Sequence, residues 1–161
     1  MFNFKPEFYL NILLLFCFTA LISAYFIEYI LGHQPCNLCL IERIPYGLSI
    51  MIIMAIFLIK KNQKFLVLLL ILTFIFSFAI SFYHYGIEQG FFQESSVCRA
   101  KDLTESINKE DLLKQLSEKT ISCRAVTFRI FGLSLTSINI VISLIFTITL
   151  LKIFIKYEKN K

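Results

Sequence analysis

Four cysteines of this 161-residue chain form two pairs whose spacing suits thiol chemistry. Cys36 and Cys39 make a C-x-x-C pair, and Cys98 and Cys123 lie 25 positions apart. A C-x-x-C disulfide closes a loop too short to stabilise a fold much, so reactivity explains the spacing better. The reactive species is the thiolate, which a nearby cation or a helix N-terminus favours. Arg43 follows Cys39 by four residues, so the stretch predicts a redox-active dithiol beside a permanent cation.

Two other uses of the cysteines are open to a chain like this one. Cys98 and Cys123 could form a structural disulfide, which stabilises a loop of this length by about 3 kcal/mol in the chain-entropy model. Four cysteines could also bind zinc, but the second pair lacks half-site spacing and neither histidine completes a regular pattern. We therefore expect no metal site. The fifth cysteine, Cys17, lies among Phe and Leu residues and is expected to pack as a small apolar side chain.

The elements that must position these residues are predicted to be membrane helices. The chain is 57% hydrophobic and 17% charged, whereas soluble domains are about 45–50% apolar and about 25% charged. A helix needs about 20 apolar residues to cross a hydrocarbon core of about 30 Å. Lipid offers no partner to an unpaired backbone group, so each apolar run is expected to be helical. The sequence thus predicts an all-α bundle in a single membrane domain, with transmembrane helices at about 8–31, 40–59, 65–85 and 132–155.

The start of the second helix decides how its motif is presented. If the helix begins near Cys39, Arg43 lies one turn further along the same face. If it begins at Ile44, Pro45 occupies the first helical position, where its missing N–H costs nothing, and the cysteines lie on the preceding turn. Either start places Arg43 close to Cys39.

A cleavable signal peptide is the rival interpretation of residues 1–24. Lys5 precedes an apolar stretch that ends near small residues. The stretch is longer than the roughly 7–15 residues of a signal sequence, and its hydrophobicity continues to Leu31. We expect the segment to be a retained membrane helix.

The distribution of charge predicts the orientation. Eight lysines and two glutamates flank the runs on one side, a net charge of +6, and the other side nets −1, which together give the overall +5. By the positive-inside rule the lysine-rich side is cytoplasmic, and it holds both termini. The net positive charge of the chain therefore reflects its orientation in the membrane, and we expect no nucleic-acid partner. The eight lysines are Lys5, Lys60, Lys61, Lys64, Lys152, Lys156, Lys159 and Lys161.

This orientation leaves two outer loops, a short one at about 32–43 and a long one at about 86–131, which together hold the four paired cysteines. Disulfides persist outside the cytosol and do not persist inside it. Within the long loop, residues 108–119 carry three leucines on one helical face behind Asn108, a suitable N-cap. The segment is expected to form a short amphipathic helix, either solvated or lying along the membrane surface.

Taken together, these residues resemble the DsbB family of bacterial inner-membrane thiol oxidoreductases. The resemblance covers most of the chain. It rests on P-C-x-L-C-x-x-x-R at residues 35–43, Y-H-Y-G-I-E at 83–88, the outer cysteine pair, and F-G-L-S-L at 131–135.

The resemblance implies a role for each matching residue. Cys98 would form a mixed disulfide with a periplasmic thioredoxin-fold oxidase of the DsbA type, and Cys123 would pass the reducing equivalents to Cys36. Cys39 would lie nearest a membrane quinone, ubiquinone or menaquinone. Arg43 would stabilise the negative charge that develops on the quinone, and His84 would border the quinone site.

The chain also departs from the family pattern, and other functions compete. Many relatives carry an acidic residue after the last cysteine and a Trp in the fourth helix, where this chain has Arg124 and the segment 137–139; this leaves partner preference open. A VKOR-like enzyme would place its C-x-x-C after the loop cysteines, whereas here it precedes them. A non-catalytic membrane subunit would use the disulfides only to hold a loop. Asn11 and Asn139 are expected to hydrogen-bond between helices, within or between chains.

Overall fold

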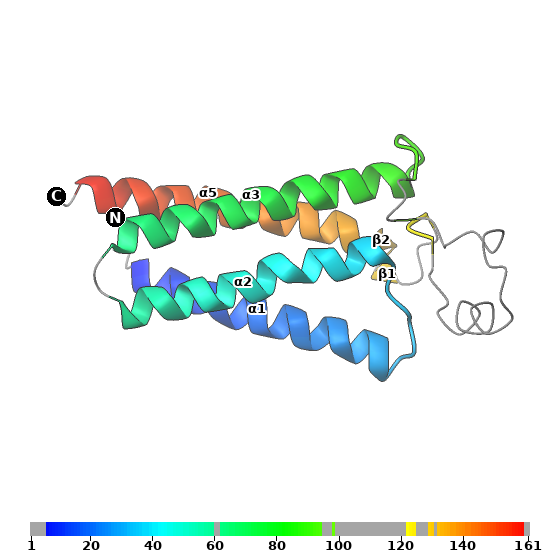
Figure 1. Cartoon of the computed structure of the whole chain (residues 1–161), viewed down its shortest axis with the longest axis horizontal. Helices are drawn as coiled ribbons and strands as arrows, with labels where there is room; N and C mark the ends of the chain where they lie inside the picture. Colours follow the sequence, from blue (N-terminus) through cyan, green and yellow to red (C-terminus); the bar gives the residue numbers. More distant parts are fainter. Residues whose placement is uncertain are drawn as a thin grey trace, which may run out of the picture.

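The computed structural model describes residues 6–59, 62–94, 98, 122–124, 129–130 and 132–159. In this part of the chain, four long helices run side by side along the long axis of the molecule (Figure 1). Each is long and apolar enough to cross a membrane, which confirms the predicted four-helix fold of a multi-pass membrane protein. The helices are α1 (Pro6–Tyr29), α2 (Asn37–Leu58), α3 (Gln63–Glu88) and α5 (Leu135–Lys159).

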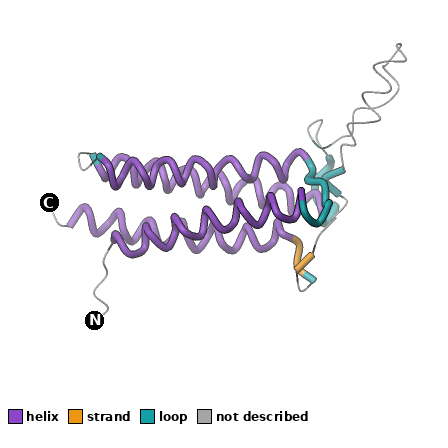
Figure 2. Tube along the Cα trace, turned by 90° about the horizontal axis from the view of Figure 1, so that it is seen from below, coloured by secondary structure: helices purple, strands orange, loops and turns teal. Residues whose placement is uncertain are grey.

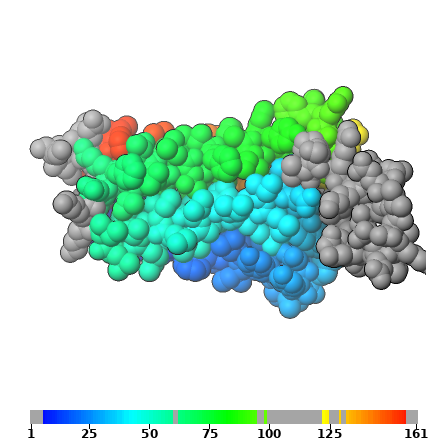
Figure 3. Space-filling model, in the orientation of Figure 1, coloured from blue at the N-terminus to red at the C-terminus, as the bar shows by residue number. Residues whose placement is uncertain are grey.

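The helices pack in the order α1, α2, α3, α5, with α3 and α5 in the most extensive contact. The space-filling view shows α2 between α1 and α3 on one face (Figure 3). The buried centre is made of side chains such as Ile53, Leu70, Phe74 and Leu150, while many large apolar side chains remain exposed. In a membrane protein these exposed side chains suit contact with lipid. Cys17 is fully buried in this core, as the sequence predicted.

The second helix takes the earlier of the two predicted starts. It begins at Asn37, with Cys36 as its N-cap, so that Cys39 and Arg43 both lie on its first turns. Pro45 lies inside the helix, and the alternative of Pro45 at the first helical position is wrong. The proline has no N–H to donate to the helix ladder. The Ser49 hydroxyl, one turn later, donates to the carbonyl of Pro45 at 2.7 Å.

The end of α3 is shaped by Gly86, on which the chain folds back. The N–H groups of Phe91 and Phe92 both donate to the Gly86 carbonyl, at 2.8 and 3.1 Å. A Cβ at position 86 would lie 2.1 Å from Cδ2 of Phe92, so only glycine leaves room for this ring. The Phe92 ring also stacks on Tyr83, with ring centroids 5.7 Å apart. These contacts fix the turn in which the chain reverses after α3.

A small hairpin precedes the last helix. Strand β1 (Arg129–Ile130) pairs antiparallel with β2 (Leu133–Ser134), with Arg129 opposite Ser134. Gly132, at φ +82°, supplies the left-handed backbone of the intervening turn. The Ser134 hydroxyl then accepts the backbone N–H of Ser137 at 3.2 Å, which caps the start of α5.

The two ends of the bundle differ. The α1–α2 connection, the end of α3 and the hairpin gather at one end (Figure 2). The cysteine pairs belong to this end, because Cys36 is the N-cap of α2 and the other three paired cysteines pack with it. At the other end α1 begins, α5 ends and α2 meets α3 (Figure 1). The predicted helix at residues 108–119 lies outside the described residues, as does most of the long loop.

Candidate redox site

The C-x-x-C pair lies on the first turn of α2. The Cys36 Sγ atom accepts a hydrogen bond from the backbone N–H of Cys39 at 3.2 Å, as expected of an N-cap. The two Sγ atoms lie 2.7 Å apart, and both residues are free thiols in this structure. A disulfide requires about 2.05 Å between the sulfur atoms, so only a small side-chain movement separates the thiols from a bond.

The position of Cys36 favours its thiolate. The side chain of Cys39 donates a hydrogen bond that holds the pKa of the Cys36 thiol below its ordinary value, and burial opposes this effect. The backbone N–H of Cys39 acts in the same direction as its side chain. An N-cap position adds the positive end of the helix dipole. Cys36 is therefore the thiol that ionises readily.

A buried histidine and a buried carboxylate lie behind this thiol. The Nε2 atom of His84 lies 3.5 Å from the Cys36 Sγ atom, and its Nδ1 atom lies 2.8 Å from Oε1 of Glu42. His84 is only 2% exposed, and Glu42 is 9% exposed. Thr136 of α5 also approaches the Nδ1 atom, at 3.4 Å, and donates to Glu88 at 2.6 Å. The sequence placed His84 at the quinone site but gave no role to Glu42.

Asn139 fixes the other oxygen of Glu42. Its amide donates to Glu42 Oε2 at 3.0 Å and to the Ser81 hydroxyl at 2.7 Å. The Tyr46 hydroxyl donates to the Asn139 carbonyl oxygen at 2.5 Å. Asn139 therefore joins α5 to α2 and α3, which confirms its prediction as an interhelical hydrogen-bonding residue. Asn11, the other predicted residue, is exposed on α1.

The outer cysteine pair lies against the inner one. Cys98 and Cys123 form a disulfide, and each is 2% exposed. Both belong to one buried cluster with Cys36, Leu38 and Ile87, against which Cys39 also packs. Two pairs from separate loops are thus packed together, and exchange between the pairs requires such proximity of thiol and disulfide.

A carboxylate at the end of the α3 turn holds the segment around Cys123. Glu94 Oε1 accepts hydrogen bonds from the Ser122 hydroxyl and from the backbone N–H of Arg124, the latter at 3.1 Å. The guanidinium of Arg124 lies near Gly90, where an added Cβ would approach its Nη2 atom to 2.9 Å. The residues on both sides of Cys123 are therefore attached to the turn that follows α3.

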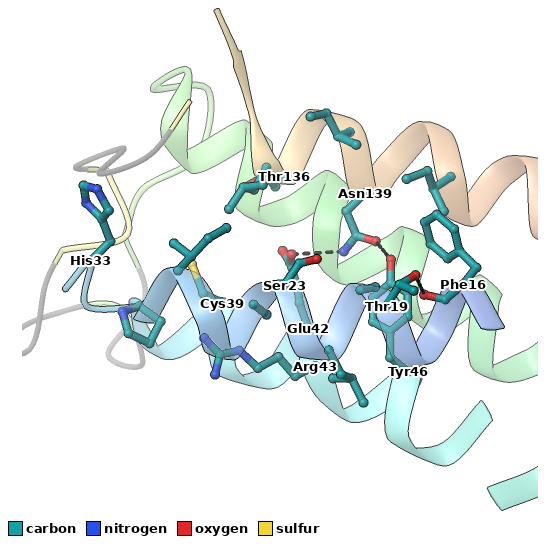
Figure 4. A pocket seen from close by; sticks show the side chains of 18 of the residues that line it. Phe16, Thr19, Ser23, His33, Cys39, Glu42, Arg43, Tyr46, Thr136 and Asn139 are labelled. Atoms are coloured by element: carbon teal, nitrogen blue, oxygen red, sulfur yellow. Dashed lines mark hydrogen bonds between the residues drawn. The ribbon is translucent and has the colours of Figure 1, made fainter. Parts of the chain in front are cut away.

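A cavity of about 450 Å³ opens beside Cys39. Figure 4 shows it between α1 and α5, with α2 along one side. Most of its wall is apolar and comes from α1 and α5, including Phe16, Leu21, Ile138 and Ile142. Six of the polar lining residues come from α2 and α5: Cys39, Glu42, Arg43, Tyr46, Thr136 and Asn139. Thr19 and Ser23 of α1, and His33 and Gln34 of the connection to α2, line the rest.

Arg43 lines this cavity and is held from α1. Its Nη1 atom lies 2.5 Å from Oε2 of Glu28, and its guanidinium stacks over the Tyr25 ring at 5.0 Å from the centroid. The sequence left open whether Arg43 faces a site beside Cys39 or only lipid headgroups. The structure places both Arg43 and Cys39 on the wall of one cavity.

Comparison with known proteins decides the family. Residues 6–153 match the family described as disulfide bond formation protein DsbB. The chain belongs to the DsbB family. Its relative in Rickettsia prowazekii (strain Madrid E), the uncharacterized protein RP370, is 30% identical over 152 residues, which cover 93% of this chain and 88% of the relative. No solved structure matches the chain. Membership of the DsbB family supports a role as a membrane thiol–disulfide oxidoreductase.

The cavity of this DsbB-family protein fits a quinone in size and in chemistry. Sites for small ligands are about 300–1,000 Å³, mostly apolar, with a few converging polar groups. Here apolar walls would cover a ring and the first part of its lipid tail. Arg43 has N–H donors beyond the one that binds Glu28, and these would hold a ring oxygen, whereas the donors of Tyr46 and Asn139 are already used within the network.

Metal binding is the other chemistry that these side chains allow. The donor atoms of Cys36, Cys39 and His84 lie within 4.8 Å of one another. These are the atoms that thiol chemistry would use, and the prediction of no resident metal stays a prediction. The sequence did not predict that His84 lies beside the two thiols, because this contact depends on how α3 is rotated against α2.

Several site residues escaped the sequence analysis. Glu42 and Glu28 are acidic residues at the edges of apolar runs, and ionisable residues within membrane segments are functional candidates by default. That signal could have found both. Tyr46 and Thr136 carried no such signal, since hydroxyl side chains are common in membrane helices.

Proposed function

We propose that this DsbB-family protein oxidises a periplasmic DsbA-like thioredoxin-fold protein and passes two electrons to ubiquinone or menaquinone, which sustains disulfide formation. One observation carries the proposal: the Cys98–Cys123 disulfide and the Cys36/Cys39 dithiol share one buried cluster, and Cys39 lines a cavity. The outer pair faces the substrate and the inner pair faces the acceptor.

The cysteine roles follow from this order. Cys98 forms the mixed disulfide with the partner, which releases the Cys123 thiolate. Once the inner pair has been oxidised to a disulfide, Cys123 attacks its Cys36 sulfur and Cys39 leaves. The partner's second thiol then frees Cys98, which attacks Cys123 and restores the outer disulfide. Cys36 leaves in this last step, and its lowered pKa favours that departure. Cys98 is buried, so the side chains that cover it have to move before a thiolate of the partner can attack its sulfur atom.

The acceptor side is served by residues of α2 and α5. A bound quinone would accept two electrons and two protons from the dithiol. Arg43, which Glu28 and Tyr25 hold in place, stabilises negative charge at a ring oxygen of the quinone. His84 borders this site through Glu42 and Thr136, which contact it and also line the cavity.

The proposed location is the bacterial inner membrane, with both termini in the cytoplasm. Support comes from the lysines that flank the runs on one side, a net charge of +6, against −1 on the other. The cysteine end of the bundle then faces the periplasm.

The decisive experiment combines thiol trapping with quinone reduction. Purified protein, quinone and a reduced DsbA-type partner should give turnover that is lost in Cys39→Ser and in Cys98→Ser and is weakened in Arg43→Ala. In membranes without quinone, the partner should reduce both cysteine pairs. Pairs that stay oxidised under these conditions would support a structural role for the disulfides. Unchanged turnover in either cysteine variant would refute the mechanism.

A further inference from the structure

A continuous chain of contacts joins the Cys36 thiol to the cavity. It runs from the Cys36 Sγ atom to Nε2 of His84 at 3.5 Å, and from Nδ1 of His84 to Oε1 of Glu42 at 2.8 Å. Glu42 lines the cavity, and Asn139 holds its second oxygen at 3.0 Å. The thiol and the cavity wall are therefore connected by groups that can carry a proton.

The carboxylate determines which nitrogen of His84 can act as a base. An ionised carboxylate only accepts hydrogen bonds, so the Nδ1 atom facing Glu42 carries the hydrogen. In the neutral ring the Nε2 atom then bears the free lone pair, and it is the Nε2 atom that faces Cys36. Glu42 also stabilises the ring once a second proton arrives. Carboxylate, imidazole and nucleophile stand in the same order in Ser-His-Asp triads.

We propose that His84 is the general base that takes the proton of the Cys36 thiol, and that Glu42 positions His84 and passes this proton toward the cavity. The inference rests on the proposed function, which it deepens. Oxidation of the dithiol forms one S–S bond and releases two electrons and two protons. A quinone bound in the cavity would take up both electrons and both protons, so no further oxidant is needed.

Among the described residues, few other groups near Cys36 can accept its proton. The titratable groups around Cys36 and His84 are Cys39, Glu42 and Glu88. Glu88 lies 3.9 Å from Nε2 and binds Thr136, so it is too distant to replace Cys36 as the partner of Nε2. The Cys98–Cys123 disulfide in the same cluster does not titrate. Of these titratable groups, Glu42 is the one that both binds His84 and lines the cavity; Thr136 does both as well, but its hydroxyl donates to Glu88.

The test measures the thiol itself, in reduced protein without quinone or partner. The rate of Cys36 alkylation by iodoacetamide is followed against pH, with the modified peptide quantified by mass spectrometry. In Glu42→Gln, the amide can donate to Nδ1 and leave the hydrogen on Nε2, where it can no longer accept from Cys36. The alkylation midpoint should then rise by about one pH unit, because the base is lost. Removal of the Glu42 charge, which by itself raises the Cys36 pKa, partly offsets this rise.

A second variant and a matched control keep the test specific. His84→Gln should raise the midpoint at least as much, because the Glu42 charge remains. The double variant should raise it no further than His84→Gln alone, because the two residues act as a unit. Glu7→Gln removes an exposed carboxylate on the first turn of α1, away from the site, and it should leave the midpoint in place. Thermal melting identifies any variant that fails to fold.

Two outcomes overturn the proposal: a folded Glu42→Gln whose midpoint is unchanged, or shifts in the two single variants that add in the double variant. A quinone-loaded single turnover provides the second readout. There, Glu42→Gln should slow quinone reduction at least tenfold without weakening quinone binding, and a normal rate would exclude proton passage through Glu42. If wild-type protein reduces no quinone while the midpoints still shift, the proposed acceptor is wrong and the base role of His84 stands.

Discussion

Arg43 of α2, which lines the cavity, binds Glu28 of α1, with the Arg43 Nη1 and Glu28 Oε2 atoms 2.5 Å apart. Both side chains are mostly buried, at 15% and 20% exposure. Breaking such a pair leaves one charge uncompensated in a site of low polarity. The pair therefore fixes the position of the cation that we assign to the quinone.

Glu28→Gln should separate the positioning of Arg43 from its charge. Without its carboxylate partner, Arg43 can turn toward the membrane surface, so we expect the KM for quinone to rise about tenfold, which corresponds to about 1.4 kcal/mol. Steady-state kinetics with quinone as the varied substrate measures this. Glu7→Gln, on the exposed first turn of the same helix, is the matched control. Equal KM values for the two variants would mean that Glu28 does not position Arg43.

The lowered pKa of Cys36 predicts a pH dependence of stability in the reduced protein. A thiol whose pKa is depressed by folding stabilises the folded state above that pKa, and the contribution is lost as pH falls through it. Reduced protein should thus unfold at higher temperature as pH rises toward about 8.5, the ordinary thiol value. Cys39→Ala removes the main donor to Cys36 and should flatten this rise. An equally steep rise in Cys39→Ala would contradict the assignment.

The turn after α3 allows a matched pair of glycine substitutions. Gly86→Ala would place a Cβ 2.1 Å from the Phe92 ring, so it should lower the melting temperature and speed the reduction of Cys98–Cys123 by dithiothreitol. Gly47→Ala meets nothing within 4 Å inside α2 and should be neutral or stabilise by up to about 1 kcal/mol. Similar melting temperatures for the two variants would show that the Phe92 contact is dispensable.

The bundle and the cysteine pairs could be predicted because each has a strong local signal. Four long apolar runs admit only helices in lipid, and C-x-x-C followed by Arg43 is visible as a motif. The contact between Glu42 and His84 could not be predicted in the same way. The two residues are 42 positions apart, and their meeting depends on the rotation of α2 against α3. The 83–88 motif was recognised, but only the fold explains it, since it supplies both His84 and the glycine beneath Phe92.

Arg43 illustrates the limit of spacing arguments. Its position four residues after Cys39 correctly predicted the shared face, because one helical turn separates them. Its partners Glu28 and Tyr25 come from another helix, and no periodicity in α2 refers to them. The sequence could therefore locate the cation but could not show what fixes it.

Asn139 should contribute to stability as well as to the site. Replacement by Leu would leave the Glu42 Oε2 atom and the Tyr46 hydroxyl without their partner inside the bundle. Each buried group left unpaired costs about 1–3 kcal/mol, so Asn139→Leu should melt well below the wild type. Asn11→Leu is the matched control, because Asn11 is exposed on α1 and leucine suits a lipid-facing surface. Melting in detergent measures both variants, and the Cys36 alkylation midpoint should also shift in Asn139→Leu, since Glu42 loses its support. An unchanged melting temperature in Asn139→Leu would show that the network of Tyr46, Asn139 and Glu42 does not hold α5 to the rest of the bundle.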